Sequence, residues 1–294
     1  MIQSVAILGL GLMGGSLGLA LKRGGAKVTV HGFTRSRERG ELALRRGALD
    51  HFHADAHEAV RDADVVICCA PILAIPGQVA SVIDALKAGA LITDVGSTKS
   101  VIQNSCRELM TGREVYFVGS HPIAGSEQQG MEAARADLYE GAMTVITPDD
   151  LVPEEMTARA RELWERCGSC VVSMSPEEHD KVLAATSHLP HMMSSLLAAT
   201  IARPGGRDDL ACFCGTGYRG TTRLATGGTD IWLDILKTNR EAITGELKAF
   251  DEKLRSLIEK LEAGSFSDIE AVLEEGKNAR RAFDDYGNQS NSEA

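Results

Sequence analysis

The stretch Gly9-Leu-Gly-Leu-Met-Gly-Gly-Ser-Leu17 decides the fold, because it joins an apolar run at Ser4–Leu8 to a segment of helical composition. A GxGxxG spacing between a strand and a helix is typical of a dinucleotide-binding site. The first glycine permits a tight turn, the second lets the backbone approach a pyrophosphate, and the third lets the helix pack on the strand. The motif residues expected to bind the dinucleotide are Gly9, Gly11, Leu12, Met13 and Gly14.

Short apolar runs rich in valine and isoleucine alternate with helical stretches over the first half of the chain. Such runs are typical of buried strands in a parallel sheet. The alternation predicts an α/β, doubly wound domain of the Rossmann type, placed at residues 1–174. The expected strands are Ser4–Leu8, Lys27–Phe33, Asp64–Ala70, Ala90–Val95, Val115–Val118, Ala142–Thr147 and Cys170–Ser173, and the expected helices include Gly15–Arg23 and Ile75–Leu86.

The second half of the chain has no segment of strand-like composition and is predicted to be all-α. Helices are expected at His179–Ile201, Asp230–Leu261 and Ser267–Phe283. Apolar residues recur every three to four positions in the second of these, which indicates an amphipathic helix. Because about 30 residues is long for one helix of a globular domain, we expect it to form a subunit interface too. A helical substrate and dimerisation domain is thus placed at 175–283, with a disordered polar tail at 284–294.

The composition excludes several classes of partner. A net charge of -10 and an aromatic content of 4% argue against nucleic-acid binding, which needs a basic face and stacking side chains. No apolar run reaches the roughly 18 residues of a membrane-spanning helix. Seven cysteines without framework spacing are typical of a reducing compartment, and the single pair Cys167 and Cys170 predicts no metal site. We therefore expect a cytoplasmic protein.

The end of the second predicted strand decides between NAD and NADP. An acidic residue there would bind the ribose 2′-hydroxyl of NAD, but this chain has Thr34, 20 residues after Gly14. A hydroxyl followed by arginines suits the 2′-phosphate of NADP, because a guanidinium pairs with it and no carboxylate repels it. The residues expected there are Thr34, Arg35, Ser36 and Arg37. NADP is the expected cofactor; NAD, with a merely solvated basic loop, is the alternative.

Two polar side chains follow predicted strands at the edge of the sheet where ligands bind in such folds. Ser97, within Asp94–Lys99, offers a hydroxyl, and its alternative role is to cap the next helix. His121, within Gly119–Gly125, is a candidate base because an imidazole titrates near neutral pH. A loop histidine without a role is the alternative.

Further candidates lie in the helical half. Ser187 and His188 stand four and three residues before His191, so all three can share one helix face. Pro190 should kink this helix or begin a new one. No third ligand accompanies the two histidines locally, so we expect no metal ion. Arg223, in a glycine-rich stretch, could bind a carboxylate in bidentate fashion.

Together these segments resemble the prephenate/arogenate dehydrogenase (TyrA) family. The matching motifs come in the family order and cover most of residues 4–283. They are GLGLMGGSL at 9–17, DVGSTK at 94–99, GSHPIAGSE at 119–127, SHLPH at 187–191, and TTRLA with IW within 221–232. The glycine-rich loop is shared with many dehydrogenases, whereas GSHPIAGSE followed by SHLPH is much more specific to this family.

The resemblance implies a Rossmann domain, a helical domain that forms a homodimer, and a defined reaction. That reaction is the oxidative decarboxylation of prephenate to 4-hydroxyphenylpyruvate, or of arogenate to tyrosine. By position, the resemblance implies that His121 takes the proton of the ring 4-hydroxyl, that Ser97 holds this hydroxyl, and that Arg223 binds a carboxylate. The other implied substrate contacts are Ser187, His188, His191, Glu127 at the site entrance, and Trp232 reaching in from the partner subunit.

Two departures from the family pattern leave the substrate open. Gly220 stands where some members carry an aspartate, and Thr226–Asp230 differs from the usual Gly-Ser-Asp-Pro. The second histidine of the SHLPH motif favours prephenate over arogenate. Two other classes remain as alternatives. A β-hydroxyacid-type dehydrogenase would use Lys181 as its base, and a non-catalytic nucleotide-binding module would not need His121.

Overall fold

A computed structural model describes residues 2–23, 27–125, 128–202 and 210–292. The chain forms two compact units, residues 1–240 and 241–294. All strands of the described residues lie in the first unit. These units divide at residue 240. The boundary expected at 174, between the nucleotide-binding and the helical domain, stays a prediction.

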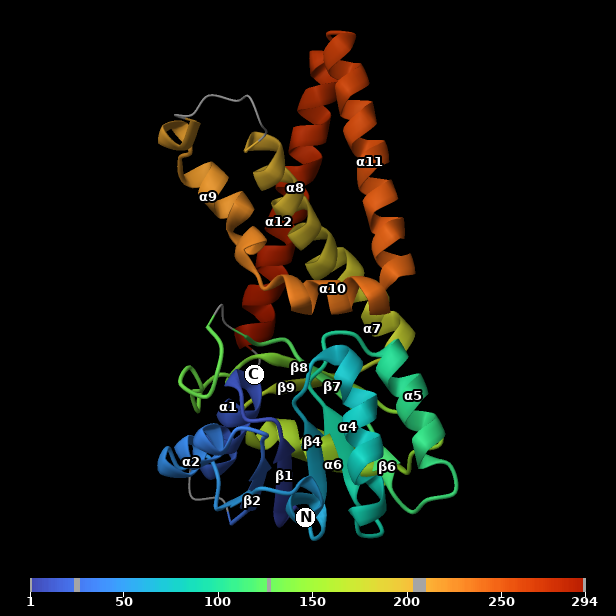
Figure 1. The fold of residues 1–294 in the computed structure, drawn as a ribbon. Coiled ribbons are helices and arrows are strands. Elements are labelled where there is room, and N and C mark those ends of the chain that lie inside the picture. The colour runs from blue at the N-terminus through green and yellow to red at the C-terminus, as the bar shows by residue number, and fades with distance from the viewer. Residues whose placement is uncertain (1, 24–26, 126–127, 203–209, 293–294) are drawn as a thin grey trace. The chain divides into compact units, whose positions relative to one another are not determined.

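A parallel sheet of six strands, in the order β3-β2-β1-β4-β5-β6, forms the centre of the first unit (Figure 1). Its strands are β1 (Ser4–Leu8), β2 (Thr29–Phe33), β3 (His51–His53), β4 (Val65–Cys68), β5 (Leu91–Asp94) and β6 (Tyr116–Phe117). The predicted Rossmann-type sheet is thereby confirmed. The order reverses between β1 and β4, and a dinucleotide binds beyond the carboxyl ends of the strands at such a point. Strand β3 was not predicted, because it has only three residues, two of them histidines.

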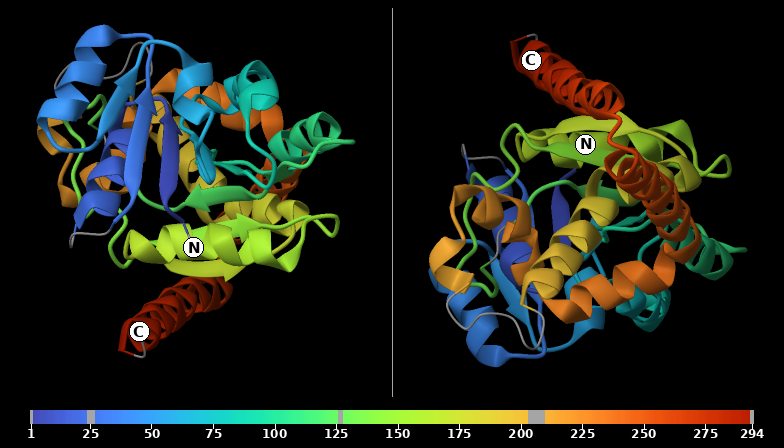
Figure 2. Two further views of the ribbon diagram at one scale, coloured as in Figure 1. Left: turned by 90° about the horizontal axis from the view of Figure 1, so that it is seen from below. Right: turned by 90° about the horizontal axis from the view of Figure 1, so that it is seen from above.

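Helices cover both faces of this sheet (Figures 1 and 2). They are α1 (Leu12–Lys22), α2 (Arg37–Arg45), α3 (Ala56–Val60), α4 (Ile75–Val82), α5 (Ser100–Met110) and α6 (Glu154–Arg166), with short 3-10 turns η2 (Ile72–Ala74) and η3 (Ile83–Ala85). One buried cluster joins Val5 and Ile7 of β1 to Leu17 and Leu21 of α1 and to Trp164 of α6. Strands buried on both faces explain why their sequences are continuously apolar rather than alternating.

A second sheet of three strands lies beyond the carboxyl end of β5. It consists of β7 (Gly119–Pro122), β8 (Met143–Thr147) and β9 (Cys170–Ser173), with β7 antiparallel to β8 and β8 parallel to β9. The last two predicted strands therefore belong to this sheet and not to the parallel one. Hydrogen bonds from Ser120 attach β7 to β5: its N–H donates to Asp94 Oδ1 (3.0 Å), and its hydroxyl lies 2.8 Å from that of Thr93.

The rest of the first unit is helical, as predicted. It contains α7 (Pro176–Leu183), the π-helical turn η4 (Ala184–His188), α8 (Leu189–Ile201), η5 (Leu210–Phe213), α9 (Thr216–Thr222), η6 (Arg223–Thr226) and α10 (Thr229–Thr238). The single helix expected at His179–Ile201 is thus interrupted by a π turn. Pro190 stands in the first turn of α8, where its missing N–H does no harm, so a new helix begins there.

The described part of the second unit contains α12 (Phe266–Ser292) and all of α11 (Arg240–Glu262) except its first residue. The single long helix predicted at Asp230–Leu261 is wrong, because the chain breaks at Asn239, whose φ of -126° and ψ of 32° are not helical. Helix α12 is described as far as Ser292, and the disordered tail expected at 284–294 stays a prediction. No helix among the described residues is long and apolar enough to cross a membrane.

Candidate active site

The glycine-rich loop has the geometry that its motif predicts. Gly9 has a φ of 113°, and a Cβ there would lie 2.3 Å from the carbonyl oxygen of Cys69. A Cβ on Gly14 would lie 2.0 Å from the carbonyl oxygen of Gly9, so α1 can approach the loop only without a side chain. A Cβ on Gly11, by contrast, would meet nothing within 4 Å. This open position at the N-cap of α1 fits the pyrophosphate of a dinucleotide.

The loop is fastened to the segment that follows β7. The Tyr139 hydroxyl donates to the carbonyl oxygen of Met13 (2.7 Å), and the Arg135 N–H donates to Ser16 Oγ (2.9 Å). Leu12 and Met13 are half-buried in the first turn of α1. The segment that leads away from His121 therefore also holds the cofactor loop in place.

Of the four residues predicted to select NADP, two have structural partners. Ser36 is the N-cap of α2, and its Oγ accepts from the Arg39 N–H (3.3 Å). Arg37 Nε donates to Glu41 Oε1 at 2.8 Å on the same helix. Thr34 is half-buried directly after β2 and Arg35 is exposed beside it, so these two are the stronger candidates for a 2′-phosphate.

His121 lies on β7 and is 8% exposed. Its Nδ1 lies 2.9 Å from Nε2 of His179, a residue that the sequence analysis did not select. Burial lowers the pKa of His121 well below its ordinary value, and the electrostatic influence of His179, Lys99 and His188 lowers it further. The imidazole is therefore neutral near pH 7, which is the state that a general base needs.

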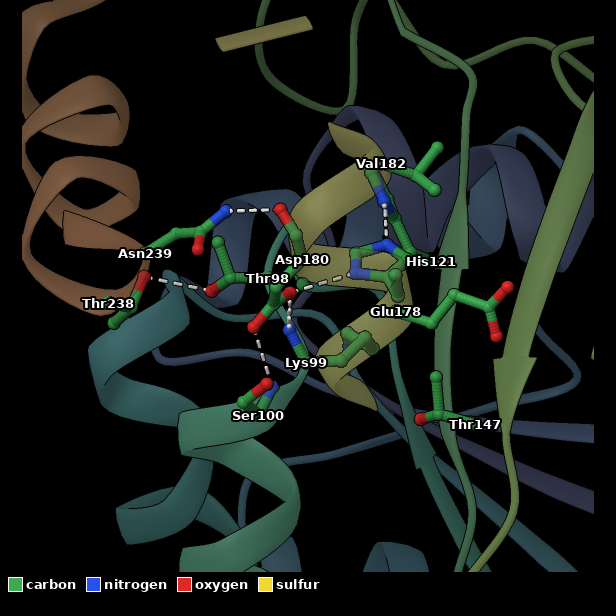
Figure 3. A network of polar contacts seen from close by, with 12 residues as sticks. Thr98, Lys99, Ser100, His121, Thr147, Glu178, Asp180, Val182, Thr238 and Asn239 are labelled. Atoms are coloured by element: carbon green, nitrogen blue, oxygen red, sulfur yellow. Dashed lines mark hydrogen bonds and ion pairs between the residues drawn. The ribbon is translucent and has the colours of Figure 1, made fainter. Parts of the chain in front are cut away.

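Ser97 is half-buried in the loop between β5 and α5. It does not cap α5, which begins at Ser100. The carboxylate of Asp180 does so instead, by accepting from the N–H groups of Lys99 (2.7 Å) and Ser100 (2.9 Å) (Figure 3). The structural alternative for Ser97 is thereby removed, and its hydroxyl lies outside the capping interaction.

A buried ion pair supports the same loop. Lys99 and Asp94 are paired and fully buried, and Lys99 Nζ also donates to the carbonyl oxygen of Ser120 (2.8 Å). Next to them, the hydroxyls of Thr98 and Thr238 lie 2.8 Å apart. These contacts join the end of β5, strand β7 and the end of α10 around the loop that carries Ser97.

His188 is 1% exposed in the π-helical turn. The side-chain amide of Asn239 lies 3.3 Å from its Nδ1 and donates to the backbone oxygen of Asp180 at 2.6 Å. Burial lowers the pKa of His188 to about 4, so the ring is neutral. Because the amide N–H donates to Nδ1, the ring proton lies on Nε2.

His191 and Trp232 form a stacked pair with ring centroids 3.5 Å apart and an interplanar angle of 14°. Trp232 also meets His188 edge-on at 6.0 Å. Within the chain, Trp232 packs on these two histidines because only Gly227 and Gly228 separate α10 from η6, and η6 packs on α8. The contact with a partner subunit that the resemblance implied for Trp232 stays a prediction.

Two of the remaining predicted residues lie in the described part of the chain. Arg223 is exposed at the start of η6, an element held to α8 by a hydrogen bond from the Ala225 N–H to Ser194 Oγ (3.1 Å). Ser187 is half-buried beside His188. Glu127 lies outside the described residues.

Three residues of the site, His179, Asp180 and Asn239, escaped the sequence analysis. A signal for the first two was present, because a histidine and an aspartate stand next to each other near the start of α7, three and four residues after Pro176. Both side chains are buried, and buried polar groups need partners. Nothing in the local pattern showed that those partners would be His121 and the start of α5.

Comparison with known families covers both halves of the chain. A model of the nucleotide-binding domain of prephenate dehydrogenase matches residues 17–173, and one of its dimerization domain matches 175–275. A cyclohexadienyl dehydrogenase from Zymomonas mobilis is 32% identical, over 95% of this chain and 94% of its own length. A prephenate dehydrogenase from Bacillus subtilis is 33% identical, over 87% and 69% respectively.

Solved structures agree with this assignment. Prephenate dehydrogenase from Aquifex aeolicus in complex with hydroxyphenyl propionate and NAD+ has a TM-score of 0.88 and 29% identity, covering 96% of this chain and 99% of that one. Synechocystis arogenate dehydrogenase has a TM-score of 0.83 and 28% identity, covering 95% and 99%. A 3-hydroxyisobutyrate dehydrogenase from Mycobacterium tuberculosis, at 17% identity and a TM-score of 0.54, shares the fold alone. The chain therefore belongs to the prephenate dehydrogenase family of oxidoreductases.

Proposed function

We propose that this protein catalyses the oxidative decarboxylation of prephenate to 4-hydroxyphenylpyruvate, with NADP as the hydride acceptor. The observation that carries the proposal is His121, a buried imidazole held beyond the carboxyl end of β5 by the bonds between Ser120 and Asp94. The open position at Gly11 lies beyond the carboxyl end of β1 in the same parallel sheet. A base and a dinucleotide site at one edge of the sheet suit hydride transfer coupled to proton removal.

A bound nicotinamide supplies the acceptor for the hydride that leaves the carbinol carbon of the substrate. His121 accepts the proton of the hydroxyl on that carbon as the C–H bond breaks. Carbon dioxide then leaves, the ring becomes aromatic, and the phenolate oxygen takes the proton back from His121. Because aromatisation drives the loss of carbon dioxide, no metal ion is needed as an electron sink.

The substrate contacts in this proposal come from both halves of the first unit. Ser97 holds the ring hydroxyl, and the guanidinium of Arg223 pairs with a carboxylate of the dianionic substrate. The Nε2–H of His188 donates to the substrate, and the stacked pair of His191 and Trp232 forms an aromatic wall. Ser187 and, from the resemblance, Glu127 complete the proposed contacts.

The preference for NADP rests on the residues after β2. Thr34 stands where an NAD-binding fold carries an acid, and the exposed guanidinium of Arg35 follows it. A 2′-phosphate gains a charge-assisted hydrogen bond there and meets no carboxylate. NAD remains the alternative, and the Aquifex aeolicus relative was solved with NAD+.

Arogenate is the second candidate substrate. It carries an amino group where prephenate carries a keto group, and a Synechocystis arogenate dehydrogenase shares the fold and 28% identity. The segment Thr226–Asp230, which departs from the family pattern, joins η6 to α10 near the expected position of the substrate side chain. The stacked second histidine, His191, favours prephenate.

We also propose that the protein is a cytoplasmic homodimer formed through its helical half. The match of residues 175–275 to a dimerization domain supports this. In the second unit, exposed apolar side chains recur at helical spacing along α11, and their burial by a second copy would stabilise a dimer. They are Phe250, Leu254, Ile258 and Leu261. Sedimentation equilibrium that returns the mass of a monomer at micromolar concentration would contradict this part.

A two-by-two initial-rate assay tests the function. Prephenate or arogenate is combined with NADP or NAD, and the reduced nicotinamide is followed at neutral pH. We expect the highest kcat/KM with prephenate and NADP. A higher value with arogenate, or with NAD, replaces that part of the proposal, and the absence of a rate in all four combinations refutes it.

A further inference from the structure

Three buried side chains form a continuous line that ends at His121. His121 Nδ1 lies 2.9 Å from His179 Nε2, and His179 Nδ1 lies 2.8 Å from Asp180 Oδ1. Their exposed fractions are 8%, 0% and 4%. The line connects β7 of the second sheet to the first turn of α7, 58 residues further along the chain. No other part of the proposed mechanism uses His179 or Asp180.

Asp180 is held as a carboxylate. Its two oxygens also accept from the N–H groups of Lys99 (2.7 Å) and Ser100 (2.9 Å) at the beginning of α5. Figure 3 shows this carboxylate at the start of that helix. Burial alone would raise the pKa of Asp180, but the hydrogen bonds from His179 and from the backbone outweigh it and leave that pKa below its ordinary value. A helix N-terminus favours the same charged state.

The charge of Asp180 fixes the direction of the hydrogen bond that it receives from His179. An ionised carboxylate can only accept, so His179 Nδ1 must carry a proton and donate it. With that one proton on the His179 ring, its Nε2 has no hydrogen to donate and accepts instead. His121 Nδ1 is then the donor at 2.9 Å, and the proton of the neutral His121 ring lies on Nδ1. The lone pair of His121 is therefore on Nε2, the nitrogen that does not face His179.

We propose that His179 and Asp180 are positioning residues that hold His121 in the tautomer with a free Nε2 lone pair. They also stabilise the imidazolium that forms when Nε2 accepts a proton. In a serine protease triad one carboxylate does this for the histidine directly; here a second imidazole stands between carboxylate and base. Asp180 need not be protonated at any stage, because the positive charge stays on His121. The catalytic part of this inference rests on the proposed function, whereas the tautomer does not.

The surroundings explain why His121 needs this support. Besides His179, the charged or titratable neighbours that affect it are Lys99 and His188, and each of them disfavours a positive charge on His121. Lys99 is itself paired with Asp94. Asp180 is thus the anion that reaches His121 through hydrogen bonds, and without it the imidazolium would form in a buried site among positive and neutral groups.

Two variants of His179 separate the two contacts. In His179→Asn the amide nitrogen can replace Nδ1 and still donate to Asp180, but nothing reaches His121. In His179→Gln the amide oxygen can replace Nε2 and still accept from His121, but the connection to Asp180 is lost. His57→Gln, at an exposed histidine of α3, is the matched control outside the site.

The first measurement is made on the full-length wild-type protein without substrate. Imidazole 15N NMR with ring-labelled histidine distinguishes the two neutral tautomers, and the signals of His121 are identified by their loss in His121→Gln. We expect a protonated Nδ1 and an unprotonated Nε2. A His121 ring protonated on Nε2 refutes the proposal, whether or not prephenate is a substrate.

The second measurement is steady-state kinetics with the substrate pair found active. We expect kcat to fall by about 10²- to 10³-fold in His179→Asn and by about tenfold in His179→Gln, with the KM for prephenate and the Kd for the cofactor nearly unchanged. The tautomer of His121 should persist in His179→Gln and become mixed in His179→Asn. Wild-type kcat in both variants overturns the positioning role, while inactivity of the wild-type protein refutes only the proposed function.

Discussion

At the scale of single residues, the site depends on one buried imidazole. His121 is neutral because burial and neighbouring charges depress its pKa, and it is attached to β5 through Ser120. We expect His121→Asn to lower kcat by about 10²- to 10⁴-fold, the usual contribution of a general base. Cofactor affinity, measured by fluorescence titration, should not change. A variant with near-normal turnover would show that His121 is not the base.

Arg223 is the second residue whose role can be measured directly. It is exposed on η6, so its replacement opens no cavity in the buried core. If it pairs with a substrate carboxylate, Arg223→Ala should raise the KM for prephenate by about 10- to 100-fold with a smaller effect on kcat. Arg223→Lys, which retains the charge but not the bidentate geometry, should lie in between. Equal KM values for all three proteins would exclude the carboxylate contact.

Arg35 tests the cofactor preference. Arg35→Ala removes a charge-assisted hydrogen bond to a 2′-phosphate, so the Kd for NADP should rise by about 10- to 100-fold. The Kd for NAD should hardly change. Arg39→Ala, at an exposed arginine of the neighbouring α2, is the control. Similar effects of both variants on both dinucleotides would mean that Arg35 contributes only general surface charge.

At the scale of the elements, the turn between β1 and α1 contains two glycines that are required for different reasons. A Cβ on Gly14 would lie 2.0 Å from the backbone of Gly9, whereas a Cβ on Gly11 would enter open space. We expect Gly14→Ala to destabilise the fold by about 1–3 kcal/mol, as overpacking does, and to lower Tm by several degrees. Gly11→Ala should keep the wild-type Tm but weaken dinucleotide binding about tenfold or more. Indistinguishable Tm values for both variants would contradict this division.

The helix break at Asn239 coincides with side-chain hydrogen bonds from Asn239 to residues of the site. The apolar spacing of Asp230–Leu261 is continuous, and it predicted one helix. In the structure Asn239 is 6% exposed, and its amide serves both the backbone of Asp180 and the ring of His188. Two buried polar partners outweigh the helical propensity of a single residue, since an unsatisfied buried group costs about 1–3 kcal/mol.

At the scale of the whole molecule, buried neutral histidines link stability to pH. The folded pKa of His188 is about 4 and that of His121 is also depressed, while an unfolded histidine titrates near about 6.5. Between these values the unfolded chain binds more protons than the folded one, so stability is fully present above about pH 6.5 and falls as the pH drops toward about 4. Each such group contributes up to about 1.4 kcal/mol per pH unit.

Urea unfolding at about pH 7.5 and about pH 5 measures this linkage. The midpoint should fall at the lower pH, and it should fall less in His188→Gln, which has no ring to protonate. A wild-type midpoint that does not change between the two pH values would mean that the buried histidines are not neutral in the folded protein.

The sequence by itself determined what depends on neighbours along the chain. Runs of buried residues placed β1, β2, β4 and β5, and the spacing of Gly9, Gly11 and Gly14 placed the dinucleotide turn. The succession of motifs identified the family, which the comparisons confirmed. Such patterns are local, because a strand, a tight turn or an amphipathic helix is decided within a few residues.

Only the tertiary structure decided how the polar groups meet. His121 and His179 are 58 residues apart in the chain. Asp180 is 80 residues away from Ser100 and 59 residues away from Asn239. No local sequence pattern connects these partners. Strand β7 was not predicted either, because Gly-Ser-His-Pro has no strand-like composition. This segment becomes a strand only by pairing with β8. The physical reason is that a buried polar group must find a partner somewhere in the fold, and packing alone determines which one comes within reach.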